Sequence, residues 1–237
     1  GSYVAKHGNR SITSKSGSAD MLEAIGVNLN LSLENSAKML EETGFTFMFA
    51  QNHHPCMKNI MPIRKSIPHR TIFNILGPLS NPATVSKQLI GVFDKSYINK
   101  LAYALDMLDT KRSMIVSSND GMDEISVSDI TYATLLINGK ITDIEINPEN
   151  YGIPLASKDD IMGEGPEFNA KLTSDILSKK IVGAKLDIVL INTAAALIID
   201  EKARDFKDGI DMAKAAIISG AAKEKLEQII QVSNRLS

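Results

Sequence analysis

The 237-residue chain has one cysteine, no tryptophan and only 5% aromatic residues. The single cysteine, Cys56, excludes an intramolecular disulfide and favours a reducing cytoplasm. As a nucleophile Cys56 would need an activating base, and His53 and His54 are near it in sequence. A packed cysteine is the simpler interpretation.

Long apolar runs are also lacking. The most apolar stretch, 188–199, is interrupted by Asn192 and Thr193 and is too short to cross a bilayer. The net charge is only −2, from 26 basic and 28 acidic residues that are dispersed along the chain. Neither nucleic acid nor a membrane surface is therefore an expected partner, and an anionic substrate would need positive charge gathered locally.

The order of elements predicts an α/β fold, with a central, largely parallel sheet and helices on both faces. With 43% hydrophobic residues, we expect residues 1–237 to form one domain. The sequence patterns predict strands at 45–50, 88–93 and 113–117, a hairpin of 132–137 with 141–146, a surface excursion at 147–169, and helices at 33–43, 57–65, 97–108, 170–178 and within 208–236. Residues 185–199 fit either one helix or a strand followed by a helix. Residues 77–82 are rich in turn formers.

A polar strip near the start of the chain, Lys6 to Asp20, follows the apolar Tyr3-Val4-Ala5. We predict a strand end, a loop and a helix that begins with Ser18 as N-cap and stops at Gly26. Glycine N–H groups, hydroxyls and the charges of Lys6 and Arg10 could surround a phosphate. The alternative is a polar surface loop that happens to hold two cations.

A second polar segment, Asp120-Gly121-Met122-Asp123-Glu124, follows a predicted strand. Carboxylates on a turn suit Mg²⁺, which keeps several waters and is often shared with substrate phosphates. The alternative is a turn whose acids face solvent. The adjacent His53 and His54 lack a third ligand at a suitable spacing, so they make a poor zinc site.

Four motifs in this order resemble the anthranilate phosphoribosyltransferase family: Lys6-His7-Gly8-Asn9-Arg10-Ser11 with Gly17-Ser18-Ala19-Asp20, Gln51-Asn52-His53-His54-Pro55 with Pro62-Ile63-Arg64, Arg70-Thr71-Ile72-Phe73-Asn74 to Pro82, and Asp120 to Ser126. The resemblance runs from Val4 to the C-terminus. It implies the fold of nucleoside phosphorylases and phosphoribosyltransferases, and transfer of a phosphoribosyl group from phosphoribosyl diphosphate to anthranilate.

The resemblance also implies roles for individual residues. Those that would bind phosphoribosyl diphosphate are Lys6, His7, Gly8, Asn9, Arg10, Ser11, Ile12, Thr13, Ser14 and Ser18. Anthranilate would meet Asn9, Arg64, His7 and His54, with Arg64 on its carboxylate. Asp123 and Glu124 would bind Mg²⁺, and no residue would act as acid, base or nucleophile.

By the same resemblance, family members carry about a hundred further residues upstream, including helices and a glycine-rich pyrophosphate loop. We therefore expect an N-terminally truncated catalytic domain that alone binds phosphoribosyl diphosphate weakly and turns over little. A homodimer of the longer form and a glutamine amidotransferase partner are further expectations. Two alternatives are a pyrimidine nucleoside phosphorylase, which would need no carboxylate-binding Arg64, and a non-catalytic nucleic-acid-binding relative, which would show a basic face.

Overall fold

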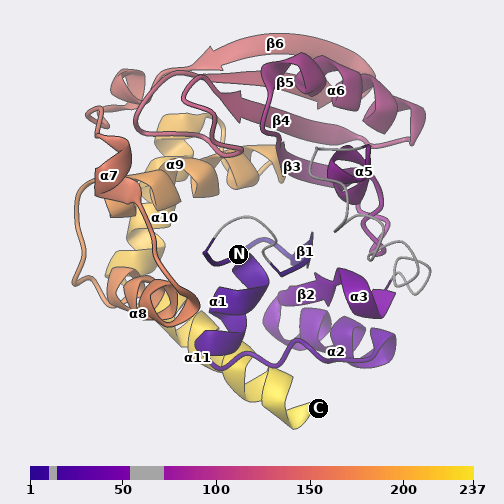
Figure 1. Cartoon of the computed structure of the whole chain (residues 1–237), viewed down its shortest axis with the longest axis vertical. Coiled ribbons are helices and arrows are strands. Elements are labelled where there is room, and N and C mark those ends of the chain that lie inside the picture. The colour runs from indigo at the N-terminus through magenta and orange to yellow at the C-terminus, as the bar shows by residue number, and fades with distance from the viewer. Residues whose placement is uncertain (11–14, 54–71) are drawn as a thin grey trace. The chain divides into compact units, whose positions relative to one another are not determined.

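The computed structural model describes residues 1–10, 15–53 and 72–237 (Figure 1). The chain forms two compact units. The first unit comprises Gly1–Thr84, Gly163–Ser174 and Ala222–Ser237. The second comprises Val85–Met162 and Asp175–Ala221.

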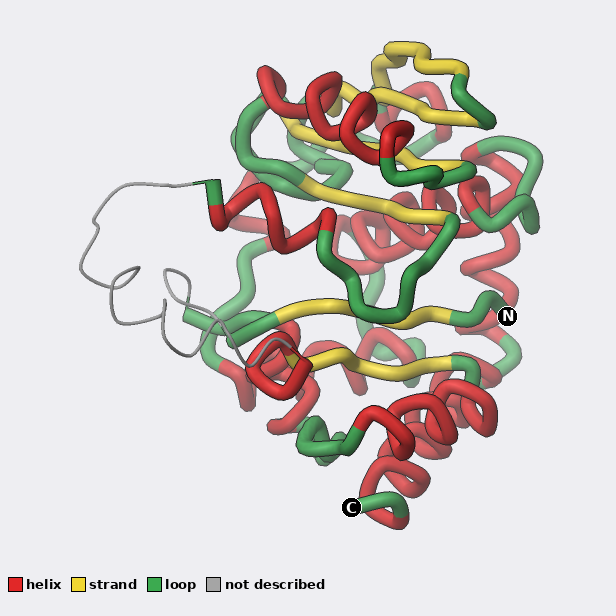
Figure 2. Tube along the Cα trace, turned by 90° about the vertical axis from the view of Figure 1, so that its right-hand side faces the viewer, coloured by secondary structure: helices red, strands yellow, loops and turns green. Residues whose placement is uncertain are grey.

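The first unit is built around a pair of parallel strands. Its elements are β1 (Val4–Gly8), α1 (Ser18–Ala24), α2 (Leu33–Thr43), β2 (Phe45–Phe49), α3 (Ala50–His53), α5 (Phe73–Leu79), most of α8 (Pro166–Leu177) and most of α11 (Ala221–Arg235). Figure 2 shows β1 and β2 side by side, and the register pairs Val4 with Phe45 and Gly8 with Phe49. Helix α2 has the predicted bounds, because Ser32 caps its start and Gly44, in the left-handed region, ends it.

The core of the first unit joins both ends of the chain. Its buried members are Ala19, Val27, Leu29, Leu31, Met39, Phe47, Phe49, Ile229 and Val232. Hydrogen bonds fasten α11 to the segment after α1: Ser233 accepts from Asn28 N, and Asn234 donates to Gly26 O. The segment after α1 is thus fastened to residues more than 200 positions away in the sequence.

The second unit holds a four-stranded sheet. Its elements are β3 (Lys87–Gly91), η1 (Lys95–Tyr97), α6 (Ile98–Met107), β4 (Arg112–Ser118), β5 (Thr131–Ile137), β6 (Lys140–Ile146), η2 (Pro148–Tyr151), α7 (Lys158–Ile161), α9 (Ala184–Ile199) and α10 (Phe206–Ile218). The strand order is β3-β4-β5-β6, with β3 parallel to β4 and the other pairs antiparallel. The α/β class is confirmed, and the described strands form one parallel pair and one mixed sheet.

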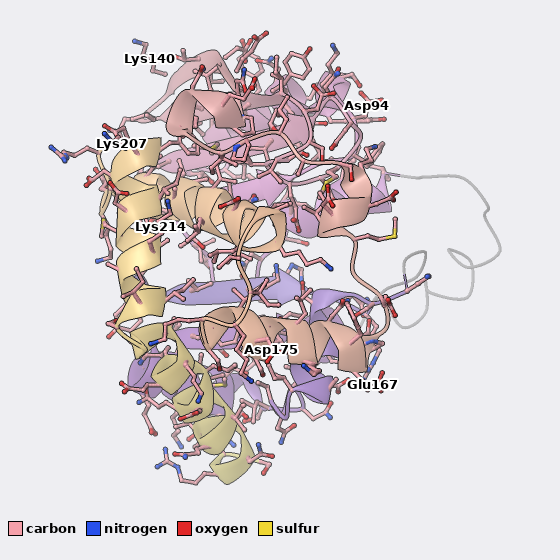
Figure 3. All side chains as sticks on the ribbon, turned by 90° about the vertical axis from the view of Figure 1, so that its left-hand side faces the viewer. Asp94, Lys140, Glu167, Asp175, Lys207 and Lys214 are labelled. Atoms are coloured by element: carbon pink, nitrogen blue, oxygen red, sulfur yellow. The ribbon has the colours of Figure 1, made fainter. Side chains whose placement is uncertain are left out.

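Helices cover the central strand β4. Helix α6 packs against β4 and β5, and α9 packs against β3 and β4. Residues Ser113–Ser118 are all buried, so both faces of β4 are covered. Helix α10 lies on α9 at a close approach, because a Cβ on Gly209 would stand 2.8 Å from Ala194 Cα. Lys207 and Lys214 extend from the exposed side of α10 (Figure 3).

The structure fixes three element ends. Helix α5 ends within the turn formers at 77–82, because it continues through Gly77 and Pro78 to Leu79. The apolar spacing within 97–108 would place Leu108 on the inward face of the predicted helix, but α6 ends at Met107 and Leu108 is 59% exposed. The second strand of the predicted hairpin begins at Lys140, one residue earlier than expected, because Lys140 pairs with Ile137 and leaves Asn138 and Gly139 as a two-residue turn.

Candidate functional site

The first candidate segment lies where β1 and β2 end. Because the strands are parallel, their carboxyl ends meet at one edge, which is where ligands bind in α/β sheets. Asn9 and Arg10 follow β1 there, and α3 follows β2. Lys6, His7 and Gly8 were predicted as loop, but their backbones belong to β1, since they pair with Phe47, Met48 and Phe49.

The side chains of this strand end have different surroundings. The Lys6 side chain is exposed and makes no hydrogen bond or ion pair with any residue in the described part of the chain. His7 Nδ1 lies 3.2 Å from the carbonyl oxygen of Gly77 in α5. Gly8 packs against the ring of Phe47, where a Cβ would stand 2.9 Å from Cζ. This close packing explains glycine at position 8.

Arg10 is tied to α1. Its Nη2 donates to Glu23 Oε1 at 2.8 Å, and its Nη1 donates to Glu23 Oε2 and, at 3.4 Å, to Asp20 Oδ1. The hydrogen bonds to Glu23 raise the pKa of the Arg10 guanidinium. The guanidinium also lies 5.5 Å from the centre of the Phe49 ring. These contacts hold the start of the polar strip against α1 and β2.

The start of α1 differs from the prediction. Gly17, not Ser18, is the N-cap, and Ser18 is the first helical residue. The carboxylate of Asp20 accepts from Gly17 N at 2.8 Å, so an acidic side chain already occupies one backbone donor at this end. Gly26 follows the helix with a φ of 102°, as expected for a stop signal. The remaining predicted site residues of this unit lie outside the described residues: Ser11, Ile12, Thr13, Ser14, His54 and Arg64.

The second candidate segment, the acidic turn at residues 119–126, lies where the parallel strands β3 and β4 end. Asp120 organises it: its carboxylate accepts from Ser126 Oγ at 2.7 Å and from Met122 N at 3.0 Å. Lys158 donates to the Asp120 carbonyl oxygen. Burial opposes ionisation of Asp120, but the hydrogen bonds from Ser126 and Met122 outweigh it and lower the pKa of the carboxyl.

Asp123 and Glu124 are exposed on this turn. The Asp123 carboxylate has no hydrogen bond or ion pair among the described residues. No three His, Cys, Asp or Glu side chains of residues 1–10, 15–53 and 72–237 form a group suited to a metal. Two adjacent exposed carboxylates fit Mg²⁺ as a partial ligand set, because this ion is usually bound by one or two carboxylates, waters and substrate phosphates.

Two contacts fix the backbone beside these carboxylates. A Cβ on Gly91, at the end of β3, would stand 1.5 Å from the Asp123 carbonyl oxygen, so only glycine allows this approach. The side chain of Asn192 in α9 bonds to both backbone groups of Ile125. Sequence reasoning missed Gly91, Asn192 and Glu23. The signal for Asn192 was its position inside an apolar run.

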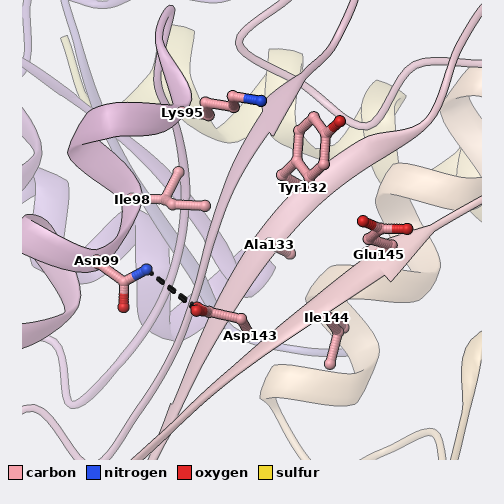
Figure 4. A pocket seen from close by; sticks show the side chains of 8 residues that line it. All are labelled: Lys95, Ile98, Asn99, Tyr132, Ala133, Asp143, Ile144 and Glu145. Carbon is pink, nitrogen blue, oxygen red and sulfur yellow. Dashed lines mark hydrogen bonds between the residues drawn. The ribbon is translucent and has the colours of Figure 1, made fainter.

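A separate hollow of about 300 Å³ lies beside β5 and β6 (Figure 4). Its lining residues are Lys95, Ile98, Asn99, Tyr132, Ala133, Asp143, Ile144 and Glu145. Asn99 Nδ2 donates to Asp143, which also accepts from Thr134, and Lys95 lies 4.4 Å from the Tyr132 ring centre. Since these polar groups pair with one another, the hollow supports no substrate assignment.

Comparison with known proteins decides the family. Residues 1–223 match the model of the glycosyl transferase family, a/b domain. An anthranilate phosphoribosyltransferase of Rubrobacter xylanophilus is 41% identical over 237 residues, which are all of this chain and 69% of that protein. The chain belongs to the anthranilate phosphoribosyltransferase family. Another relative of that name, from Methanobrevibacter smithii, is 46% identical over 98% of this chain and 69% of its own length.

Solved structures of this family share the fold. The Thermus thermophilus enzyme has a TM-score of 0.91 and 35% identity, over 99% of this chain and 69% of its own. A Saccharomyces cerevisiae enzyme, solved in complex with PRPP (phosphoribosyl diphosphate) and Mg, has a TM-score of 0.89 and 27% identity, over 98% and 65%. Membership of a transferase family does not favour the phosphorylase or the nucleic-acid-binding alternative. None of the described helices could span a membrane.

Proposed function

We propose that the chain transfers the phosphoribosyl group of phosphoribosyl diphosphate to anthranilate. The observation that carries this proposal is the pair of exposed carboxylates, Asp123 and Glu124, on a turn with a fixed backbone, in a member of this family. In the reaction, the amine nitrogen of anthranilate bonds to the anomeric carbon as the bond from that carbon to pyrophosphate oxygen breaks. The amine then loses a proton to solvent or pyrophosphate.

The polar strip holds phosphoribosyl diphosphate in this proposal. Lys6 is the exposed cation that meets a phosphate oxygen, and His7, Gly8, Asn9, Arg10, Ser11, Ile12, Thr13, Ser14 and Ser18 make up the rest of the binding segment. Arg10 contributes mainly by position, because Glu23 and Asp20 hold its guanidinium at the start of the strip. An aromatic amine needs no activated protein nucleophile, so orientation of the two substrates supplies most of the rate.

Asp123 and Glu124 hold Mg²⁺ in this proposal. When bound, the ion neutralises charge on the leaving pyrophosphate. Asp120 does not act as a ligand here: its oxygens accept hydrogen bonds that shape the turn.

Anthranilate is placed by Arg64, with Asn9, His7 and His54 beside it. A guanidinium pairs with a carboxylate through two charge-assisted hydrogen bonds, which suits Arg64 to the anthranilate carboxylate. A homodimer of the longer form, an amidotransferase partner and a cytoplasmic location stay predictions that belong with this function.

Calorimetry with two sets of ligands tests the proposal. With Mg²⁺ present, the chain should bind phosphoribosyl diphosphate weakly, bind anthranilate, and show no heat with inorganic phosphate and a pyrimidine nucleoside. Binding of the second set in place of the first would favour the phosphorylase alternative and overturn the assignment.

A further inference from the structure

The side-chain amide of Asn192 pairs with the residue that follows the two proposed magnesium ligands. Asn192 Oδ1 accepts from Ile125 N at 3.0 Å, and Asn192 Nδ2 donates to Ile125 O at 2.8 Å. This is the two-bond exchange that a residue makes with its partner across an antiparallel ladder. A side chain of α9 therefore substitutes for a neighbouring strand at the turn.

The orientation of this amide is itself fixed. Asn192 Nδ2 also donates to Ile188 O at 2.9 Å, one turn earlier in α9. Ile125 is fully buried, so its backbone groups cannot turn to water if Asn192 is removed. Loss of the amide should therefore shift the Ile125 backbone rather than leave it in place with unpaired groups.

Glu124 lies between two fixed points. On one side, the Asp123 carbonyl packs against Gly91, and on the other, Ile125 pairs with Asn192. No side chain of the described residues steers the Asp123 carboxylate through a hydrogen bond or ion pair. As far as the described residues go, the backbone then sets the direction in which that carboxylate leaves the turn.

We propose that Asn192 is a positioning residue for the Asp123–Glu124 pair. By pairing with Ile125, it fixes the backbone from which both carboxylates extend, and so raises the affinity of the pair for a divalent cation. The inference rests on the proposed magnesium role of Asp123 and Glu124. Removal of groups that orient metal ligands weakens metal binding by about 10- to 100-fold, which sets the expected size of the effect.

The test uses Mn²⁺ as a paramagnetic substitute for Mg²⁺, titrated into the full chain with phosphoribosyl diphosphate and followed by electron paramagnetic resonance. Asn192→Leu removes the amide at similar size and without new charge, and Asn192→Ser removes it with a smaller side chain. Thr193→Val is the matched control, because the Thr193 hydroxyl donates within α9, to Val189 O at 2.7 Å, and bonds to no other element of the described chain. Unfolding midpoints are measured first, and each titration is done well below the midpoint of that variant.

Both Asn192 variants should bind Mn²⁺ about 10-fold more weakly than the wild type, and Thr193→Val should bind as the wild type does. Wild-type Mn²⁺ affinity in a folded Asn192 variant overturns the inference. Asp123→Asn separates the two proposals. If it weakens Mn²⁺ binding while the Asn192 variants do not, only the positioning role fails. If Asp123→Asn binds Mn²⁺ as the wild type does, the magnesium role fails and the inference with it.

Discussion

The guanidinium of Arg10 and the carboxylate of Glu23 form a two-bond ion pair across 13 positions of sequence. The pair joins the segment that follows β1 to α1. Both side chains are partly exposed, at 45% for Arg10 and 28% for Glu23. Such a pair contributes little to the free energy of unfolding, and its main effect is on the geometry of the strip.

Glu23→Gln tests this geometry. We expect it to weaken binding of phosphoribosyl diphosphate by about threefold, equivalent to ~0.7 kcal/mol, because the strip loses its attachment to α1. The unfolding midpoint should hardly change. Calorimetric titration of the variant and of Arg10→Lys checks this. Tighter binding by Glu23→Gln would mean that Glu23 competes with substrate for Arg10.

Asp120→Asn should reveal a pH-dependent contribution to stability. Hydrogen bonds from Ser126 and Met122 keep the pKa of Asp120 below its ordinary value of 3.8 despite the cost of burial. The ionised carboxylate therefore stabilises the fold above pH 3.8, and this stability is lost as the pH falls through the lower folded pKa. We expect the free energy of unfolding of Asp120→Asn to be about 1 kcal/mol lower than that of the wild type at pH 7, and this difference to shrink in acid. Urea unfolding at several pH values measures it, and a constant difference would contradict the explanation.

Gly91→Ala should disturb the acidic turn from the opposite side. The new Cβ would overlap the Asp123 carbonyl oxygen, so either β3 or the turn must move, at a cost of about 1–3 kcal/mol. Gly77→Ala is the control, because nothing lies within 4 Å of its Cβ position. Chemical unfolding should give Gly91→Ala a free energy of unfolding at least about 1 kcal/mol lower than that of Gly77→Ala. Equal curves would show that the approach of Gly91 to Asp123 is not as close as described.

Arg64→Ala tests the assignment that rests on the motif alone. It should weaken anthranilate binding about 10-fold or more, because a charge-assisted hydrogen bond contributes about 1.5–3 kcal/mol. Affinity for phosphoribosyl diphosphate should stay nearly unchanged. Lys65→Ala is the control and should leave both affinities as they are. An unchanged anthranilate affinity in Arg64→Ala would remove Arg64 from the acceptor site.

Local signals predicted well those elements whose ends are set by neighbouring residues. Ser32 and Gly44 fix α2 through short-range hydrogen bonds. Asn138-Gly139 fixes the hairpin because both residues adopt the positive φ that the turn needs. The end of α5 could not be predicted in this way. There the Gly77 carbonyl accepts from Ser80 N and lies 3.2 Å from His7 Nδ1, and the second contact is tertiary.

Local signals likewise predicted one part of the candidate site and missed the other. The motifs identified the two polar segments, and the parallel strand pairs place each of them at a carboxyl edge. The partners that hold these segments are distant in sequence: Asn192 lies 67 positions from Ile125. No local pattern links such pairs, because the fold brings them together.

The most direct test of the central claim is a titration of phosphoribosyl diphosphate with Mg²⁺ into the wild type, Lys6→Ala and Asp123→Asn. Lys6→Ala should bind about 10-fold more weakly with or without Mg²⁺, since a charged hydrogen bond to phosphate is lost. Asp123→Asn should instead lose the gain in affinity that Mg²⁺ gives the wild type. Lys38→Ala, an exposed lysine of α2, should match the wild type. Wild-type affinities in both Lys6→Ala and Asp123→Asn would contradict the account.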